Sequence, residues 1–372
     1  MNASSLAASA LLIVPSWSLG ASFVPLGDLP GGIFESVATA VSNNGEVVVG
    51  YASSSVGREA FVWTSSNGMV GIGDLPGGGY QSIGYGVSDD GTVVVGWGTD
   101  GTGLHGTSSF RWTSSGGMVG LGNGAAYGAS ADGGTIVGAL TGTSMNEAFR
   151  WTESDGMVGL GQLSGSGYSS VAFGVSADGT AVVGSGQFDG GAQAFRWTAD
   201  DGMVGLGDLP GGHFSSHATD ASADGAIVVG YGSNAVDLEA FRWTSDGGIV
   251  GLGDLAAGAA ISRAHSVSAD GEVVVGYGTS GNGNEAFYWT QSTGMQRLLD
   301  VLVAQGATGL TGWKLTDARS ISGDGTVIVG YGLDPLGQTQ AFMAVIPPPP
   351  SLALFGSALG VMGWMRRGSV RV

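Results

Sequence analysis

Short apolar runs that end in glycine recur along most of the chain. Residues 47–50 (Val-Val-Val-Gly) follow residues 42–45 (Ser-Asn-Asn-Gly), and the same serine, turn and valine pattern begins again at six further serines. These are Ser88, Ser130, Ser176, Ser222, Ser268 and Ser322. A pattern that returns at a fixed period of this length is typical of a solenoid, a propeller or a linear array.

Each unit of about 46 residues predicts four short strands. In the first unit these strands are residues 37–41, 47–50, 61–63 and 69–75. Asn-Gly or Asp-Gly between the first two is a strong hairpin signal, because tight turns need positive φ. Phe61 and Trp63 share one face of the third strand, because side chains alternate. Four strands in each of seven repeats predict an all-β fold, a seven-bladed β-propeller.

The two ends of the repeat region predict that the ring is closed by the N-terminal strand. The last unit runs into a proline run after Phe342 and has no fourth strand of its own. Residues 23–29 (Phe-Val-Pro-Leu-Gly-Asp-Leu) match the missing strand. A closed ring would use this offset to pair its first and last blades and hide the free edges. A β-solenoid is the alternative fold.

Composition supports a folded protein and excludes several classes of function. The chain has 73 Gly but also 43% hydrophobic residues, so the glycines indicate tight turns rather than disorder. The net charge is −18 and Lys314 is the single lysine, which disfavours binding of nucleic acid. Cysteine is absent, which excludes disulfides, thiol catalysis and cysteine-ligated zinc.

The two termini indicate export. Residues 1–21 contain an apolar run followed by small residues, as in a signal peptide. We therefore predict a signal peptide at 1–21, a propeller at 22–346 and a tail at 347–372. The tail combines a proline-rich linker, a short apolar segment at 351–365 and a basic end that begins with Arg366 and Arg367. The apolar segment is short for a membrane span, and the arginines follow it as they would on the cytoplasmic side of a membrane; a plain tail anchor is the alternative.

Two resemblances extend this interpretation. The order of prolines, apolar segment and arginines is similar to the PEP-CTERM sorting signal, although Pro348 replaces the usual Glu. This resemblance implies transient anchoring in the inner membrane through residues 351–365, processing by exosortase machinery, and a cell-envelope or extracellular location. Ala-Phe-x-Trp-Thr, Gly-Met-Val-Gly-Leu-Gly-Asp-Leu and Pro-Gly-Gly resemble the HAF repeat of probable extracellular proteins. The name-giving His of that repeat is Glu, Ser or Gln here.

Departures from the repeat mark the candidate ligand site. At the positions two, three and five residues before the repeated serine, the first four units carry small, aromatic, aliphatic or threonine side chains, whereas the last three units carry ionisable side chains at six of these nine positions. The ionisable residues are His217, Asp220, Arg263, His265, Asp317 and Arg319. On the innermost strands they would form a mixed-charge mouth of the central channel. The alternative is a set of ion pairs that fills the channel wall.

Other candidate chemistry has a structural interpretation. The Asp of each Ser-x-Asp-Gly turn is expected to accept backbone N–H bonds rather than to bind calcium. His213 and His217 are four residues apart, a spacing that favours metal binding mainly on a helix, and no helix is expected here. We find no nucleophile motif, phosphate loop or paired catalytic carboxylate, and predict no catalytic residue, metal or cofactor.

These observations predict an exported binding or structural module rather than an enzyme. Its partners would be exopolysaccharide or other surface proteins. The alternative is a glycan hydrolase or lyase with its site at the channel mouth, which would need two carboxylates about 5 to 10 Å apart. A purely structural surface module without a ligand is a third class, and fold alone does not choose among them.

Overall fold

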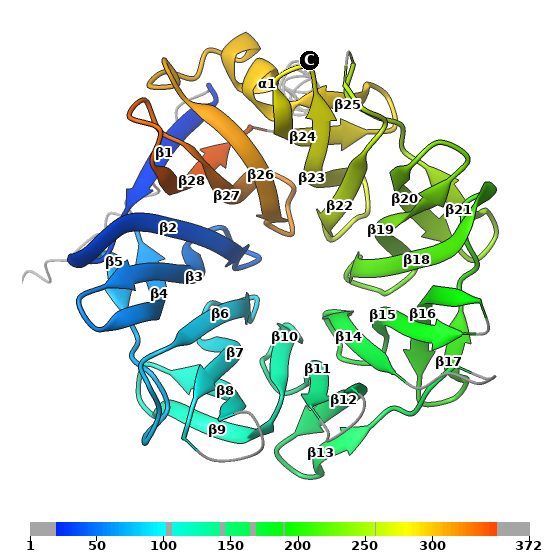
Figure 1. Cartoon of the computed structure of the whole chain (residues 1–372), viewed down its shortest axis with the longest axis horizontal. Helices are drawn as coiled ribbons and strands as arrows, with labels where there is room; N and C mark the ends of the chain where they lie inside the picture. The colour runs from blue at the N-terminus through cyan, green and yellow to red at the C-terminus, as the bar shows by residue number, and fades with distance from the viewer. Residues whose placement is uncertain are drawn as a thin grey trace, which may run out of the picture.

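Seven antiparallel blades of four strands each stand around a central axis in a computed structural model of the chain (Figure 1). A single parallel pair, Ala192 with Ser215, joins blades 4 and 5 into one sheet. The structure describes residues 20–101, 106–141, 146–163, 169–188, 190–256 and 258–347. Strands make up 61% of it and helix 2%. The predicted all-β, seven-bladed propeller is confirmed, and the β-solenoid alternative is wrong.

The strands of each blade follow the chain from the axis to the rim. Blade 1 comprises β2 (Gly31–Val41), β3 (Val47–Ser54), β4 (Gly57–Thr64) and β5 (Gly68–Gly71). Blade 2 comprises β6 (Ser82–Val87), β7 (Val93–Thr99), β8 (Thr107–Thr113) and β9 (Gly117–Asn123). Blade 3 comprises β10 (Ala125–Ala129), β11 (Ile136–Thr141), β12 (Asn146–Thr152) and β13 (Gly156–Gly159).

The remaining blades repeat this order, apart from the last. Blade 4 comprises β14 (Ser170–Val175), β15 (Val182–Phe188), β16 (Gly191–Thr198) and β17 (Gly202–Gly205). Blade 5 comprises β18 (Gly211–Ala221), β19 (Ile227–Asn234), β20 (Leu238–Thr244) and β21 (Gly248–Gly251). Blade 6 comprises β22 (Ser262–Val267), β23 (Val273–Ser280), β24 (Gly283–Thr290) and β25 (Gly294–Arg297). Blade 7 comprises β26 (Lys314–Ile321), β27 (Val327–Leu333), β28 (Thr339–Val345) and β1 (Ser22–Gly27).

The repeated phenylalanine of the third strand forms the core between blades. All seven of these side chains are fully buried: Phe61, Phe110, Phe149, Phe195, Phe241, Phe287 and Phe342. The tryptophan two residues later shares this face of the strand, but apart from Trp63 the tryptophans are only half-buried and pack against the edge of the core. These phenylalanines are the largest fully buried side chains of the core, beside smaller buried Val, Ala and Leu residues.

In several blades, a buried serine on the inner strand links the blade to the one before it. Ser216 Oγ donates to the carbonyl of Gly207 at 2.6 Å and accepts the N–H of Ala194, in the preceding blade, at 3.0 Å. The same pair of bonds is made by Ser36, Ser82, Ser170 and Ser262. Each hydroxyl thus satisfies two backbone groups that a blade edge would otherwise leave unpaired.

The ring closes as predicted. β1 pairs antiparallel with β28, with Phe23 opposite Ala344, and supplies the outer strand of blade 7. The N–H of Ala341 also donates to Ser36 Oγ at 3.0 Å, which joins the last blade to the first. The fourth strand position of blade 7 is therefore filled, and the last blade is joined to the first.

Some elements differ from the prediction. Four of the fourth strands (β5, β13, β17 and β21) end at the glycine after Met-Val or Ile-Val; after β5 the chain turns into a loop in which Gly73 has a φ of 80°. The long last unit contains α1 (Leu298–Ala304), which the strand repeat gave no reason to expect. Its Leu298 and Leu302 lie one helical turn apart and are both fully buried.

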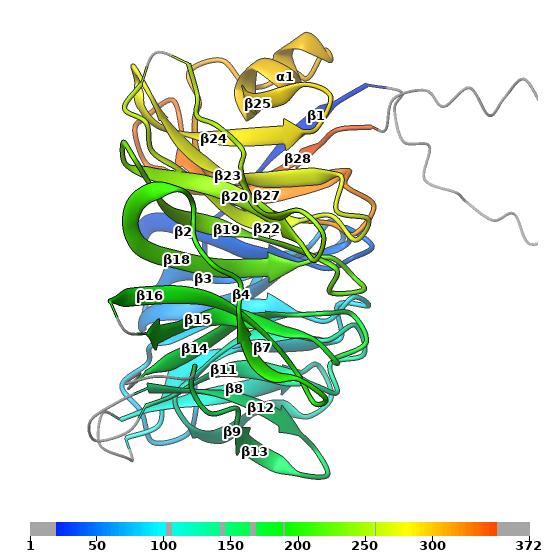
Figure 2. The ribbon, with the colours of Figure 1, turned by 90° about the vertical axis from the view of Figure 1, so that its right-hand side faces the viewer.

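The two faces of the ring differ. The face called here the turn face carries the Ser-x-Asp-Gly turns, and the opposite, loop face carries the longer connections between blades. Ser22 pairs with Val345, and the N–H of Ile346 donates to Thr326 in such a turn, so both ends of the domain lie at the turn face (Figure 2). Ala21 is buried, so the folded part includes the residue before the predicted boundary at 22.

The remaining sequence predictions about the termini fall largely outside the described residues. These predictions are the signal peptide, of which residues 1–19 lie outside, and the apolar segment at 351–365. Within the described part of the chain, no helix has both the length and the apolar character needed to cross a membrane.

Replacement of one linking serine tests the inter-blade bond. We expect Ser216→Ala to lower the free energy of unfolding by about 1–3 kcal/mol, because the Ala194 N–H and the Gly207 carbonyl lose a buried partner. Urea unfolding measures the change. Ser115→Ala, in an exposed turn, is the control and should stay within about 0.5 kcal/mol of wild type. Equal effects of the two substitutions would contradict the assignment.

Candidate functional site: the central channel

The innermost strand of every blade faces a central channel. A cavity of about 520 Å³ lies in it, lined by residues of all seven inner strands and their turns. A smaller cavity of about 220 Å³ adjoins it between blades 6 and 7, and Arg263, His265 and Arg319 border both. The larger cavity falls within the range of about 300–1,000 Å³ that is usual for small-ligand sites.

A closed circuit of hydrogen bonds surrounds the channel at the turn face. It joins the residues that follow the repeated serines, here called the collar: Asn43, Asp89, Ala131, Ala177, Ala223, Ala269 and Gly323. Six backbone N–H groups each donate to the carbonyl of the next collar residue at 2.9–3.2 Å. The seventh link is Asn43 Nδ2 donating to Asp89 Oδ2 at 2.9 Å. No sequence pattern predicted this collar, because its bonds are made mainly by backbone atoms.

One half of the channel wall is aromatic. Tyr85, Tyr127 and Phe173, from blades 2 to 4, occupy the same register and form what we call the aromatic ladder. Ring centroids lie 5.1 Å apart between Tyr85 and Tyr127 and 5.4 Å apart between Tyr127 and Phe173. Trp97 Nε1 donates to the Tyr85 hydroxyl at 3.2 Å, which fixes one end. These spacings are typical of favourable tilted aromatic pairs.

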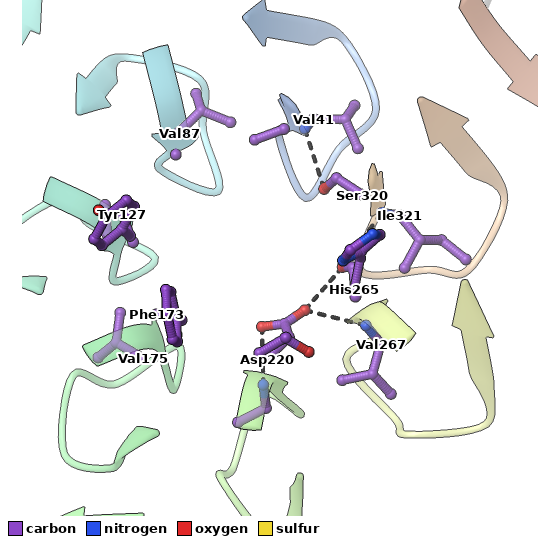
Figure 3. Close-up of a pocket in the computed structure, with 18 of the residues that line it drawn as sticks. Val41, Val87, Tyr127, Phe173, Val175, Asp220, His265, Val267, Ser320 and Ile321 are labelled. Atoms are coloured by element: carbon purple, nitrogen blue, oxygen red, sulfur yellow. Dashed lines mark hydrogen bonds between the residues drawn. The ribbon is translucent and has the colours of Figure 1, made fainter. Parts of the chain in front are cut away.

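The other half of the wall carries charge. Asp317 is only 3% exposed; its Oδ2 lies 2.9 Å from Arg319 Nε and its Oδ1 lies 3.2 Å from His265 Nε2. With Arg263 these residues form the charged cluster, on β22 and β26. Asp317 raises the pKa of Arg319, although burial of the guanidinium acts in the opposite direction. Figure 3 shows His265 across the cavity from Tyr127 and Phe173.

Several polar atoms of the charged cluster lack a hydrogen bond within the described part of the chain. They are Arg263 Nε, His265 Nε2, Asp317 Oδ1 and Arg319 Nε, all inaccessible to solvent. The two contacts of Asp317 are ion pairs by distance and are not hydrogen bonds. Arg263 Nε is also outside every ion pair of the described residues, and since an unsatisfied buried polar atom costs about 1–3 kcal/mol, it would gain from an added acceptor.

Arg263 is held by aromatic rings rather than by a carboxylate. Its guanidinium carbon lies 4.5 Å from the ring centroid of Tyr231 and 5.9 Å from that of Tyr277. No salt bridge to Arg263 is formed within the described residues. Cation–π contact stabilises a desolvated guanidinium without neutralising it. Arg319 packs similarly against Tyr331, at 5.5 Å.

Asp220 lines the larger cavity but is bonded to the wall. Its Oδ2 accepts Ser266 Oγ at 2.8 Å and the N–H of Val267 at 3.1 Å, and its Oδ1 accepts the N–H of Ala221 at 2.8 Å (Figure 3). The carboxylate lies deep in the ring although the residue borders the cavity. Burial raises its pKa to about 6, against the opposing effect of these hydrogen bonds. Ser320 Oγ, at the same register, accepts the N–H of Val41 in the next blade.

The structure brings five of the six predicted site residues to the cavities and leaves one out. Asp220, Arg263, His265, Asp317 and Arg319 line one or both cavities. His217 lines neither and stacks on Tyr231 with ring centroids 5.0 Å apart. Burial, aided by the charge of Arg263, lowers the pKa of His217.

The acidic turn residues have the structural role that was predicted. Asp90 Oδ1 accepts Ser88 Oγ at 2.7 Å and the N–H of Thr92 at 2.9 Å, and these bonds lower the pKa of Asp90. The equivalent pair of bonds is made by Asp132, Asp178, Asp224, Asp270 and Asp324. No group of three or more potential metal ligands occurs among the described residues.

Comparisons with known proteins show the fold and no family. No family model matches the chain, and no curated protein does. The oligogalacturonate lyase of Vibrio parahaemolyticus is similar with a TM-score of 0.55 at 12% identity, over 87% of this chain and 93% of that one. An oligogalacturonate lyase in complex with manganese matches at 0.51 and 13%, over 88% and 91%. TolB of Acinetobacter baumannii matches at 0.45 and 15%, over 70% of this chain and 62% of that one.

The collar generates a double-substitution test. A Cβ added at Gly323 would lie 1.2 Å from Asn43 Oδ1 and 2.3 Å from its Cγ, so Gly323→Ala must displace that side chain. We expect Gly323→Ala to destabilise by about 1–3 kcal/mol and Asn43→Ala, added to it, to recover part of that loss. Urea midpoints of the four proteins measure the coupling. Additive costs would show that the two residues do not share this space.

Asp220 generates a pH prediction. Its folded pKa of about 6 exceeds the usual 3.8, so the folded state binds more protons between these values, and acidification through that window stabilises. From about pH 7 to pH 4, wild type should gain up to about 3 kcal/mol of unfolding free energy relative to Asp220→Asn. This is an upper limit, because the residue borders a cavity. The aspartates of the Ser-x-Asp-Gly turns change stability with pH in the opposite direction, but their effect is the same in both proteins and cancels in the comparison. A stability difference between wild type and Asp220→Asn that does not change with pH would contradict a desolvated carboxylate at Asp220.

Proposed function

We propose that the protein is an exported binding module that holds an extracellular polysaccharide in its central channel. The observation that carries this proposal is the charged cluster, which faces the aromatic ladder across one cavity. Aromatic rings can pack on the apolar face of a sugar ring, and sugar hydroxyls can donate to or accept from the cluster atoms that lack partners. A surface-protein partner would have to insert a side chain to reach the same atoms.

The termini support the proposed location. The apolar start at 1–21 and the PEP-CTERM-like tail at 347–372 favour export, exosortase processing and residence in the cell envelope or outside the cell. Until processing, residues 351–365 would hold the protein at the inner membrane. Membership of the HAF-repeat group, proposed from the repeated motifs alone, agrees with this location.

A glycan hydrolase or lyase is the second candidate. The observation that favours it is Asp220, because a carboxyl group with a pKa of about 6 can hold a proton near neutral pH. Two similar structures are oligogalacturonate lyases, but at 12% and 13% identity they carry the fold only. All three bonds of the Asp220 carboxylate are made to the wall, and so we favour binding over catalysis.

A glycan-array screen of the purified protein tests the proposal. We expect wild type to bind at least one polysaccharide, and Arg263→Ala and Asp317→Ala to abolish that binding, because both residues belong to the charged cluster. Thermal unfolding of each variant checks that it is folded. Release of reducing ends or unsaturated sugars during the screen would favour the enzyme instead.

The purely structural alternative predicts another pattern. It expects no binding to any glycan and an effect of both alanine substitutions on stability alone. That result would contradict the polysaccharide proposal and favour a structural surface module without a ligand.

A further inference from the structure

We propose that the charged cluster binds the carboxylate of a uronic acid residue in an otherwise neutral glycan. The proposal rests on the binding function proposed above and names its ligand chemistry. Arg263 is the first reason. Its guanidinium is enclosed between Tyr231 and Tyr277, its Nε is buried without a hydrogen bond, and no carboxylate of the described residues pairs with it. The planar arginine fork matches a carboxylate in geometry and charge.

Asp317 limits the charge that the cluster accepts. This buried carboxylate lies 2.9 Å from Arg319 Nε and already neutralises one guanidinium. With one ligand carboxylate bound, the guanidinium groups of Arg263 and Arg319 would balance the carboxylates of Asp317 and the ligand. A doubly charged phosphate would instead leave an excess negative charge at a buried site. Asp220 does not fill this role, because its carboxylate is bonded to Ser266, Val267 and Ala221.

The charge of the whole protein favours isolated acidic groups over a dense polyanion. The net charge is −18, and this surface would repel a polymer that carries a charge on every residue. Inside the channel, surface charges farther than about 8 Å are largely screened at physiological salt, so one carboxylate can still reach Arg263. The aromatic ladder on the opposite wall suits the uncharged neighbouring sugars.

The test compares two forms of one ligand by isothermal titration calorimetry. The probes are an oligosaccharide with a single glucuronate residue and the same oligosaccharide after reduction of that carboxylate to an alcohol. Wild type should bind the acidic form at least about tenfold more tightly, as expected for one charge-assisted hydrogen bond. Arg263→Gln should bind the two forms with equal affinity, because the side chain that distinguishes the carboxylate from the alcohol is gone.

Arg242→Gln is the matched control. It makes the same change of charge on the third strand of blade 5, outside both cavities, and should keep the preference. If Arg263→Gln fails to fold, the affinities of wild type for the acidic and the reduced oligosaccharide still test whether the carboxylate is recognised. Equal binding of both forms would overturn the carboxylate inference and leave the glycan proposal intact.

Failure of the proposed function has a different signature. If neither oligosaccharide binds, or if a short peptide with one glutamate binds while both fail, the glycan proposal falls together with this inference. A loss of preference in Arg242→Gln as large as in Arg263→Gln would also overturn the assignment of the carboxylate to Arg263.

Discussion

The glycine in the middle of each second strand is the constraint on which the ring depends. A Cβ at Gly50 would lie 2.0 Å from the carbonyl oxygen of Val37 and 3.0 Å from the Phe61 ring. Only glycine lets the inner strand approach this closely while the phenylalanine fills the space beside it. Since the next blades repeat the contact, as at Gly96 and Gly230, the chain builds near-identical wedges. Wedges of one size close into a ring once β1 completes the last of them.

Because the repeated residues form the packing between blades, the residues that differ between blades lie in the channel. The phenylalanines, glycines and linking serines fix the blades, and their repetition leaves little freedom in the wall between blades. Side chains that face the channel bear less of that packing, so the units can differ there. The result is an aromatic half on blades 2 to 4 and a charged half on blades 6 and 7. The collar holds both halves at a fixed spacing.

Periodicity made the blades and the closure predictable, because both follow from strand patterns that a repeat displays directly. The site was predictable only in part. Counting back from the serines found Arg263 and Asp317, yet it also selected His217, which stacks on Tyr231 and lines neither cavity. The wall bonds of Asp220 depend on a β-bulge in β18, and the collar depends on backbone atoms. The residue types along the sequence predict neither the bulge nor the backbone bonds of the collar.

The position of the termini connects the proposed location to the proposed ligand site. Both ends of the folded domain lie at the turn face, beside the collar. The smaller cavity includes Asn284 and Thr316, near the loop-face starts of β24 and β26. A tether that continues from Pro347 would therefore hold the turn face toward the membrane and present this cavity, with Arg263 and Arg319, to the outside. Polysaccharide beyond the membrane would meet the charged cluster before it met the collar.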